Sequence, residues 1–319
     1  MDSLINRINR DYFNKIDSIY SVNGLTYNTA LKTAICPHDD YSYAGYLYPL
    51  IAKKIKAKTV IIFGVCHKAS KFNLSNQLIF DSFDKWKTPA GFVNVSESRN
   101  KIISLLPKET YQIHNEMHIL EHSVEAIIPF LQYYNPDVEI IPIIVPYMDL
   151  ETMKRISSLL AGAISEVFKG QQWGSDFAIV ISSDAVHYGT EDWGGSNFAF
   201  LGDGKEGYKK AVSKENDIIE KYFKGVITSG KIEGFFNTTV DSTDLKKYLW
   251  TWCGRFSIPF GLYTSMYLQN YTQTILKSCM TEYSTSIEHK PVKVDDIGMG
   301  VTAPAKINHW VGYAAVGYE

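Results

Sequence analysis

Three histidines in the sequence follow short apolar runs, at places where the chain would leave a buried strand. They are His38, His67 and His187, and Asp184 lies just before the third. Imidazole is the commonest metal ligand and the usual acid or base near neutral pH. One such histidine is most often a hydrogen-bonded structural residue, but three at equivalent places favour a shared site. Imidazoles and carboxylates that converge at one sheet edge form mononuclear metal sites, so the spacing predicts such a centre.

A separate group of residues, 118–122, matches the H-x-x-E-H signature of zinc hydrolases of the inverzincin type. On one helix, His118 and His122 would share a face and hold zinc. In the alternative interpretation the helix begins only near Glu121, where the next apolar pattern starts, and His118 lies in a loop. Five-residue matches are frequent by chance. A zinc hydrolase that uses His118, Glu121 and His122 is therefore the least favoured hypothesis.

Cys253 stands before Gly254, Arg255 and an apolar pattern that predicts a helix. A cysteine at a helix start has a lowered thiol pKa, which favours the thiolate and suits a metal ligand or a nucleophile. The alternative is a buried small apolar residue, the commonest fate of a free cysteine, and the residues alone favour that alternative. Cys66, next to His67, is a second candidate thiolate.

Five apolar runs rich in β-branched residues are expected to form buried strands, at residues 33–36, 59–63, 138–145, 177–182 and 274–280. Helical patterns occur at residues 46–55, 96–106, 123–134, 150–168, 207–223 and 254–271. Such strands suit a sheet covered on both faces, and the alternation predicts an α/β fold in which a mixed central sheet has helices on both faces. Ligands of such sheets gather beyond the carboxyl ends of the strands, where the three histidines fall.

The chain is expected to form one domain over residues 1–319, because no repeat or Pro- or Ser-rich linker interrupts it. Residues 1–20 have apolar side chains at helical spacing and carry charge throughout, which predicts a packed amphipathic helix rather than a signal peptide. Residues 311–318 are expected to be a strand in or beside the main sheet. The polar stretch 189–207 is expected to be a long loop beside the cleft.

The composition argues against several classes of protein. The formal net charge is −2 and basic residues form no stripe, so no nucleic-acid partner is expected. No apolar run reaches the roughly 18 residues that span a bilayer, so no membrane association is expected. Four scattered cysteines do not form a disulfide framework, and we expect a cytoplasmic protein with reduced thiols.

Seven segments occur in an order that carries a resemblance to a known family. They are PHDDYSYAG, IIFGVCHK, WKTPAG, LEHSVEAIIPF, ISSDAVHYG, TWCGRFSIPFG and WVGYAAVGY, and they extend from near His38 to the C-terminus. Together they resemble the Memo family, also called AmmeMemoRadiSam system protein B. That family is similar to class III extradiol dioxygenases, so the resemblance implies the fold of the catalytic subunit of those enzymes.

Carried over residue by residue, the resemblance implies three metal ligands, His38, His67 and Cys253. It places four polar residues beside them in the cleft, Glu121, His122, Asp184 and His187. Glu125 would lie behind these residues. The related dioxygenases have a carboxylate as third ligand, and a cysteine there makes the site softer, which favours iron, copper or zinc over magnesium or calcium. One divalent transition metal is expected, iron first, with copper or zinc as alternatives.

The sequence departs from the family pattern at four positions. Val65 and Cys66 stand where a proline and a small polar residue are usual, and Ile127 and Phe256 stand where histidines are often found. None of these departures removes an implied ligand. The last two make the site less polar than the usual pattern.

The leading hypothesis from the resemblance is a metal-dependent, dioxygenase-like oxidoreductase of unknown substrate. His122 and His187 would act as general acid or base, Asp184 would orient one of them, and Glu121 is counted with these catalytic residues. The alternative is a module that binds a phosphopeptide or another anionic ligand in the same cleft without catalysis. In both cases the cleft takes a small-molecule or peptide ligand. The family name implies a pathway link to radical-SAM and AMMECR-type proteins.

Overall fold

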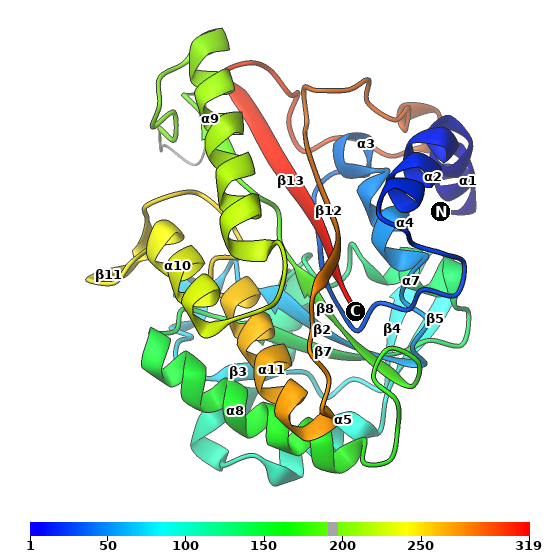
Figure 1. The fold of residues 1–319 in the computed structure, drawn as a ribbon, viewed down its shortest axis with the longest axis vertical. Coiled ribbons are helices and arrows are strands. Elements are labelled where there is room, and N and C mark those ends of the chain that lie inside the picture. The colour runs from blue at the N-terminus through cyan, green and yellow to red at the C-terminus, as the bar shows by residue number, and fades with distance from the viewer. Residues whose placement is uncertain (191–196) are drawn as a thin grey trace.

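The computed structural model describes residues 1–190 and 197–319 and is built around a mixed eleven-stranded sheet (Figure 1). Along the main path the strands lie in the order β12 (Ser278–Thr285), β13 (His309–Tyr318), β1 (Thr33–Cys36), β8 (Phe177–Ser182), β2 (Thr59–Val65), β7 (Glu139–Val145), β3 (Leu78–Phe80) and β6 (Tyr111–Ile113). The hairpin of β4 (Lys85–Thr88) and β5 (Gly91–Val95) joins β7, and β9 (His187–Gly189) pairs with β13. A separate two-stranded sheet contains β10 (Val240–Asp241) and β11 (Asp244–Tyr248).

The centre of the sheet is parallel. β8 pairs in parallel with β1 on one side and with β2 on the other, and β2 pairs in parallel with β7. In these registers Cys36 lies opposite Ser182, and Phe63 lies opposite Ile181. The carboxyl ends of β1, β8 and β2 therefore lie close together, at one edge of the sheet.

Helices cover both faces of the sheet (Figure 1). One face is covered by α5 (Ser98–Leu105), α8 (Leu150–Val167) and α11 (Ser257–Thr272), whose apolar residues share a core with α9 (Gly204–Ile218) and α10 (Ser229–Thr239). The other face is covered by α1 (Asp2–Asp11), α2 (Phe13–Val22), α3 (Tyr41–Ala44), α4 (Leu47–Ala52) and α7 (Ile128–Tyr134). The short helix α6 (Asn115–Leu120) lies at the end of β6.

The two cores follow from the alternation of side chains along each strand. In β2, Ile61 and Phe63 belong to the core beneath α8 and α11, while Val60 and Ile62 belong to the opposite core. Successive side chains of a strand point to opposite faces of its sheet, so a continuous apolar run serves both cores at once. The prediction of an α/β fold with a mixed sheet and helices on both faces is confirmed.

Several element boundaries differ from those expected. The helix expected over residues 123–134 begins only at Ile128, and the strand expected over 274–280 begins at Ser278. The N-terminal helix is interrupted at Tyr12, although Leu4, Ile5, Ile8 and Ile16 are buried as expected. The C-terminal segment is a strand of the main sheet, as expected. Part of the stretch 189–207 lies outside the described residues.

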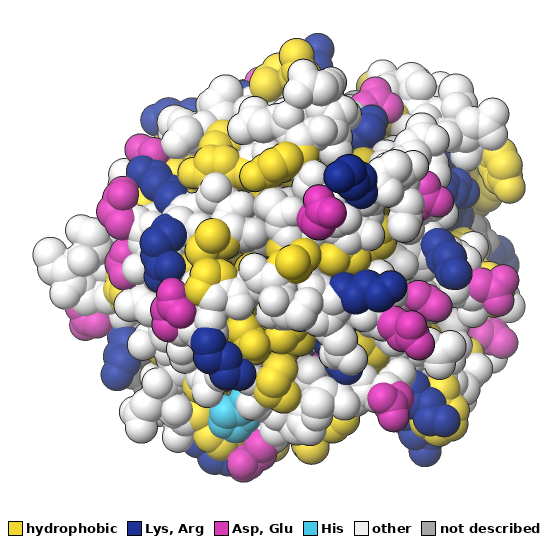
Figure 2. Space-filling view, turned by 90° about the horizontal axis from the view of Figure 1, so that it is seen from below, with side chains coloured by type: hydrophobic (Ala, Val, Ile, Leu, Met, Phe, Trp, Pro, Cys, Tyr) yellow, Lys and Arg dark blue, Asp and Glu magenta, His cyan; other side chains and the backbone are white. Residues whose placement is uncertain are grey.

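The surface viewed in Figure 2 has basic and acidic side chains interspersed, with apolar groups between them. Within the described residues, no helix combines the length and apolar character that a membrane crossing requires.

Gly261 lets α11 pack directly on the sheet. A Cβ atom at this position would lie 2.5 Å from Cγ1 of Ile181 and 3.1 Å from Cδ2 of Phe63. We expect Gly261→Ala to lower the free energy of unfolding by about 1–3 kcal/mol, because the helix must move away from a well-packed core. Chemical denaturation measures the change.

Gly230→Ala is the matched control, since a Cβ atom at that helical position would meet no heavy atom within 4 Å. It should leave stability unchanged or raise it slightly, because alanine restricts the unfolded chain more than glycine does. Equal stabilities of the two variants would show that α11 does not need the close approach.

Candidate metal centre

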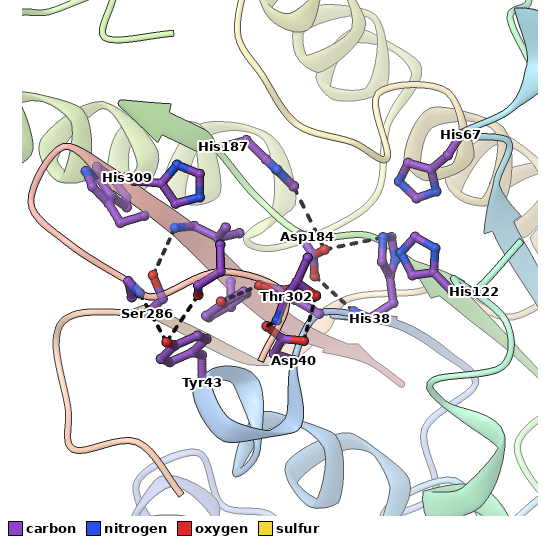
Figure 3. A pocket seen from close by; sticks show the side chains of 16 residues that line it. His38, Asp40, Tyr43, His67, His122, Asp184, His187, Ser286, Thr302 and His309 are labelled. Atoms are coloured by element: carbon purple, nitrogen blue, oxygen red, sulfur yellow. Dashed lines mark hydrogen bonds and ion pairs between the residues drawn. The ribbon is translucent and has the colours of Figure 1, made fainter. Parts of the chain in front are cut away.

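Three donor residues lie just beyond the carboxyl ends of neighbouring parallel strands. His38 follows β1, Asp184 follows β8 and His67 follows β2, each two residues after the strand ends. Because these strands are adjacent, the side chains meet at one sheet edge (Figure 3). The structure thus brings the three loops that follow these strands to one place.

Hydrogen bonds determine which nitrogen of His38 carries a proton. Nδ1 of His38 lies 2.8 Å from Oγ of Ser182, and that hydroxyl donates to the carbonyl oxygen of Ser123 at 2.6 Å. Since the single hydroxyl proton of Ser182 is used there, its oxygen accepts from the Nδ1–H group of His38. Nε2 of His38 is therefore left with a lone pair, as a metal-binding imidazole requires.

His67 is held in the same tautomer by Glu121. Nδ1 of His67 lies 2.8 Å from Oε1 of Glu121, and the backbone N–H of His67 donates to Oε2 at 2.8 Å. Burial alone would raise the pKa of Glu121, but hydrogen bonds from His67 and Ser123 lower it to about 2. The carboxylate is ionised and only accepts, so Nδ1 of His67 carries the proton. A histidine backed by a carboxylate in this way is typical of metal sites.

Cys253, which lies in the segment before α11, reaches the same place. Its Sγ accepts from the backbone N–H of Asp184 at 3.1 Å and lies 3.4 Å from Nε2 of His38. The close approach depends on Gly254, because a Cβ atom there would lie 2.1 Å from Oγ of Ser183. Cys253 is thus buried among polar atoms rather than in an apolar core.

The expected lowering of the Cys253 pKa by a helix start is wrong for the metal-free protein. The helix α11 begins at Ser257, so Cys253 lies before its first turn. Burial instead raises the pKa of the Cys253 thiol well above its usual value, and the carboxyl group of Asp184 adds to this effect. A thiolate at this position requires a nearby positive charge.

One set of donor atoms has the spacing of metal ligands. Nε2 of His38 lies 3.3 Å from Oδ2 of Asp184 and 3.4 Å from Sγ of Cys253, and the last two atoms are 4.0 Å apart. Tetrahedral ligands at bond lengths of 2.0–2.3 Å are separated by about 3.3–3.8 Å. His38, Asp184 and Cys253 therefore form a candidate metal-binding set of nitrogen, oxygen and sulfur donors.

A second set shares His38 with the first. Ligand atoms of His38, His67 and His122 all lie within 4.8 Å of one another. The ring of His67 stacks on that of His122 at 4.7 Å, and both rings lie edge-on to His38. His67 and Cys253 fall in different sets, so the trio of His38, His67 and Cys253 stays a prediction. Asp184, expected only to orient a histidine, is within ligand distance as well.

His122 and His187 lie on the walls of the site (Figure 3). Nε2 of His187 is 4.0 Å from Oδ2 of Asp184. Burial lowers the pKa of His187 to about 3, with a further contribution from His67. Partial desolvation and His67 also lower the pKa of His122, although its side chain is 61% exposed. Both imidazoles are therefore neutral at pH 7. Glu121 and His122 do not begin a helix as expected, because α6 ends at Leu120 and the next helix starts later.

His118 does not take part in the site. Its Nε2 lies 3.1 Å from the carbonyl oxygen of Ile79, and its ring lies edge-on to Trp86. It is on α6, not in a loop, but that helix ends before His122, so the two histidines do not share a helical face. Among the described residues, neither donor set includes His118. The zinc hydrolase hypothesis has no geometric support.

The donor residues other than Cys253 line a cavity of about 420 Å³. Five sequence-predicted residues line it, His38, His67, His122, Asp184 and His187. A second cavity, also of about 420 Å³, adjoins the first. Both are lined by His38, Asp39, Asp40, His122 and Thr302, whereas Glu125 lines the second cavity only. The cleft thus extends to two sides of the donor residues.

Several lining residues were not identified from the sequence. Asp39 and Asp40 lie in the first motif, but nothing in their spacing indicated that both face the cleft. Asp40 accepts from the backbone N–H of Thr302 at 2.6 Å and from its hydroxyl at 2.9 Å, which holds the 286–308 loop across the cleft. Tyr43 supports the same loop through Ala305. Loop residues of this kind have no periodic sequence signal.

Two departures from the family pattern lie away from the main cavity. Ile127 is buried in a core, and Phe256 contacts Tyr147. Phe256 lines a small cavity of about 70 Å³ together with Cys66, His67 and Cys253. Phe256 therefore adds an aromatic ring to a small cavity that His67 and Cys253 also line.

The fold and the site define a class of protein, an α/β protein with imidazole and carboxylate donors beyond the carboxyl ends of parallel strands and a cysteine beside them. A sequence model of the family described as "Memo-like protein" matches residues 7–300, and the chain belongs to this family.

Several archaeal and bacterial relatives are described as MEMO1 family proteins. A MEMO1 family protein of Methanosarcina barkeri is 32% identical over 160 residues, which cover 49% of this chain and 54% of the relative. One from Sulfurisphaera tokodaii is 30% identical over 208 residues, covering 64% of this chain and 62% of the relative. One from Aquifex aeolicus is 33% identical over 161 residues, covering 49% and 54%. The matches thus span between about half and just under two thirds of these relatives' length.

Glu121→Gln should weaken metal binding by about 10–100-fold, because His67 loses the carboxylate that fixes its tautomer. Titration of metal-free protein with Zn²⁺ against a competing chelator measures the affinity. Glu125→Gln is the matched control, since Glu125 is exposed and lines only the second cavity. Equal affinities of the two variants would show that Glu121 does not support a ligand.

His187 should make the metal-free protein less stable as the pH is lowered from 6.5 to 4.5, whereas Asp184 and Glu215, whose pKa values burial raises, act in the opposite sense. The pKa of His187 is about 3 in the folded state, against about 6.5 in an unfolded chain. Between these values His187 binds more protons in the unfolded state, so its contribution to the free energy of unfolding rises with pH. Burial also lowers the pKa of His38, so His38 contributes to the pH dependence of stability with the same sign as His187.

His187→Asn should remove up to about 1.4 kcal/mol per pH unit of this dependence, the contribution of one proton. Urea denaturation at pH 4.5, 5.5 and 6.5 measures the slope. The lowered pKa of Glu121 changes the free energy of unfolding mainly below pH 4.5, outside the measured range. An unchanged slope in the variant would mean that His187 takes up a proton readily in the folded protein.

Proposed function

We propose that this protein is a metal-dependent oxidoreductase acting on a small polar substrate in the cavity beside His38. The observation that supports it is the convergence of Nε2 of His38, Sγ of Cys253 and Oδ2 of Asp184 at 3.3–4.0 Å. A sulfur donor beside imidazole and carboxylate favours iron, copper or zinc over magnesium or calcium. Iron is the ion that we propose, since the proposed chemistry requires a redox-active metal.

The proposed ligands are His38, His67 and Cys253, with Asp184 near enough to complete or replace one of them. The bound ion would supply electron transfer and orient a substrate with adjacent oxygen atoms. Glu121 and Ser182 hold the two imidazoles with their lone pairs available. The buried position of Cys253, which is 7% exposed, excludes water from one side of the site.

His122 and His187 are the proposed proton acceptors. Both are neutral at pH 7 because their pKa values are lowered by burial, and both line the main cavity. A substrate hydroxyl in this cavity would transfer its proton to one of them. The carboxyl group of Asp184, 4.0 Å from Nε2 of His187, would stabilise the imidazolium formed there.

The charges of the cleft favour an enzyme for a neutral or cationic substrate over a module for anionic ligands. Among the described residues that line the two cavities there is no lysine or arginine, whereas Asp39, Asp40 and Asp184 are present. Phosphate groups are usually recognised by arginine or lysine. A phosphopeptide would therefore depend on the metal alone for a counter-charge.

Metal analysis of protein purified without a histidine tag tests the proposal. His38→Ala should contain no metal, because His38 belongs to both donor sets. His122→Ala and His187→Ala should retain the metal, while oxygen consumption with catechol as the probe falls by about 10²–10⁴-fold, the usual contribution of an acid–base residue.

Two results would contradict this division of roles. A metal-free His187→Ala or His122→Ala protein would identify that histidine as a ligand. Wild-type protein that holds its metal, consumes no oxygen with reducing substrates and binds a phosphopeptide in the cleft would favour the binding module.

A further inference from the structure

Glu215 is a fully buried carboxylate on α9, outside the set of residues that line the cleft. Its Oε1 accepts from Nε1 of Trp250 at 2.6 Å and from Nε1 of Trp252 at 2.7 Å. Its Oε2 accepts from the backbone N–H of Val186 at 3.0 Å. One side chain thus receives three hydrogen bonds from two separate segments of the chain.

These two segments carry residues of the candidate site. Val186 directly precedes His187, and Trp252 directly precedes Cys253. The segments also contact each other, since Val186 and Trp252 form an antiparallel bridge and the backbone N–H of His187 donates to Thr251. Glu215 therefore forms hydrogen bonds to the residues that directly precede His187 and Cys253, at the place where the two segments pair.

Packing alone would hold the indole rings without a carboxylate. Trp252 is fully buried and contacts Phe223 and Phe235. A buried carboxylate is unfavourable unless it is hydrogen-bonded, and an apolar side chain of similar volume is often as stable in such a place. Glu215 instead fixes the orientation of the two indole rings, because both N–H groups must point to the same oxygen atom.

We propose that Glu215 is a positioning residue that fixes Cys253 and His187 relative to each other through Trp252 and Val186. This inference rests on the proposed function, since it assigns Glu215 to the same metal site. The side chain of Glu215 contacts neither the donor atoms nor the cavity, so it acts through its two hydrogen-bonded neighbours.

The two tryptophans provide a matched pair of variants. Trp252→Phe and Trp250→Phe each keep an aromatic ring and remove one indole N–H donor to Oε1 of Glu215. Trp252 is adjacent to Cys253, whereas Trp250 is three residues away. An effect transmitted through the backbone to Cys253 should therefore be larger for Trp252→Phe, although both variants lose one hydrogen bond to the same oxygen.

Substitution with Co²⁺ gives a readout that a purely structural role would not move, because a cysteine ligand produces a charge-transfer band. We expect Glu215→Gln and Trp252→Phe to fold, to bind Co²⁺ about 10-fold more weakly than wild type and to show a shifted or weakened band. Trp250→Phe should keep the wild-type band. If Glu215→Gln does not fold, the pair of tryptophan variants decides the question.

The outcomes separate the two proposals. Wild-type affinity and an unchanged band in folded Glu215→Gln and Trp252→Phe would overturn the positioning role while leaving the metal site in place. Equal band shifts in Trp252→Phe and Trp250→Phe would also overturn it, because the effect would then be general to the core. A wild-type protein without a cysteine-to-cobalt band would overturn the ligand assignment of Cys253 and the positioning role together.

Discussion

The registers of β1, β8 and β2 bring the carboxyl ends of three parallel strands together, and the site depends on this alignment. Peptide hydrogen bonds and two apolar cores hold the strands, so the loops that follow begin from rigid positions. His38 and Asp184 then meet directly, since the backbone N–H of His38 donates to Oδ1 of Asp184 at 2.9 Å. The sheet thus determines where the donor residues lie. A site that rigid strands position is more precise than one that flexible loops position.

A network of buried polar groups completes the orientation of the imidazoles. Ser123 links β2 to the network, because its hydroxyl contacts both the N–H and the carbonyl of Val65 while its own carbonyl accepts from Ser182. Such groups are costly to bury unless each is paired. Here the pairing leaves one lone pair on His38 directed to the donor set. The hydrogen bonds that satisfy the buried groups therefore also prepare the site for a cation.

Much of the fold and part of the site could be predicted from the sequence. The strands that precede His38 and Asp184 are visible as β-branched runs with the observed boundaries, because their burial on both faces requires such composition. The hydrogen bond between Glu121 and His67 could not be predicted, because the two residues are 54 positions apart in the sequence and meet only in the folded protein. Glu215 was missed for a different reason. A glutamate within a helix looks like a solvated residue, and only the structure reveals the two indoles that surround it.

Burial explains the opposite pKa shifts of neighbouring donors. Burial raises the pKa of Asp184 and of the Cys253 thiol and lowers that of His38, so all three groups favour their neutral forms in the metal-free protein. A bound cation reverses this preference for the carboxyl and thiol groups, because it stabilises their ionised forms directly. Metal binding is then coupled to the loss of protons from the acidic donors.

This coupling also bears on the charge of the ion. A thiolate and a carboxylate together carry two negative charges, and Asp39 and Asp40 line the same cavity, where no described lining residue is a lysine or arginine. A monovalent ion would leave part of this buried negative charge without compensation, which is unfavourable in a medium of low dielectric constant. The neutral imidazoles of His38 and His67 add donors without adding charge. The electrostatics of the cleft, independently of any preference for soft donors, therefore match a divalent ion.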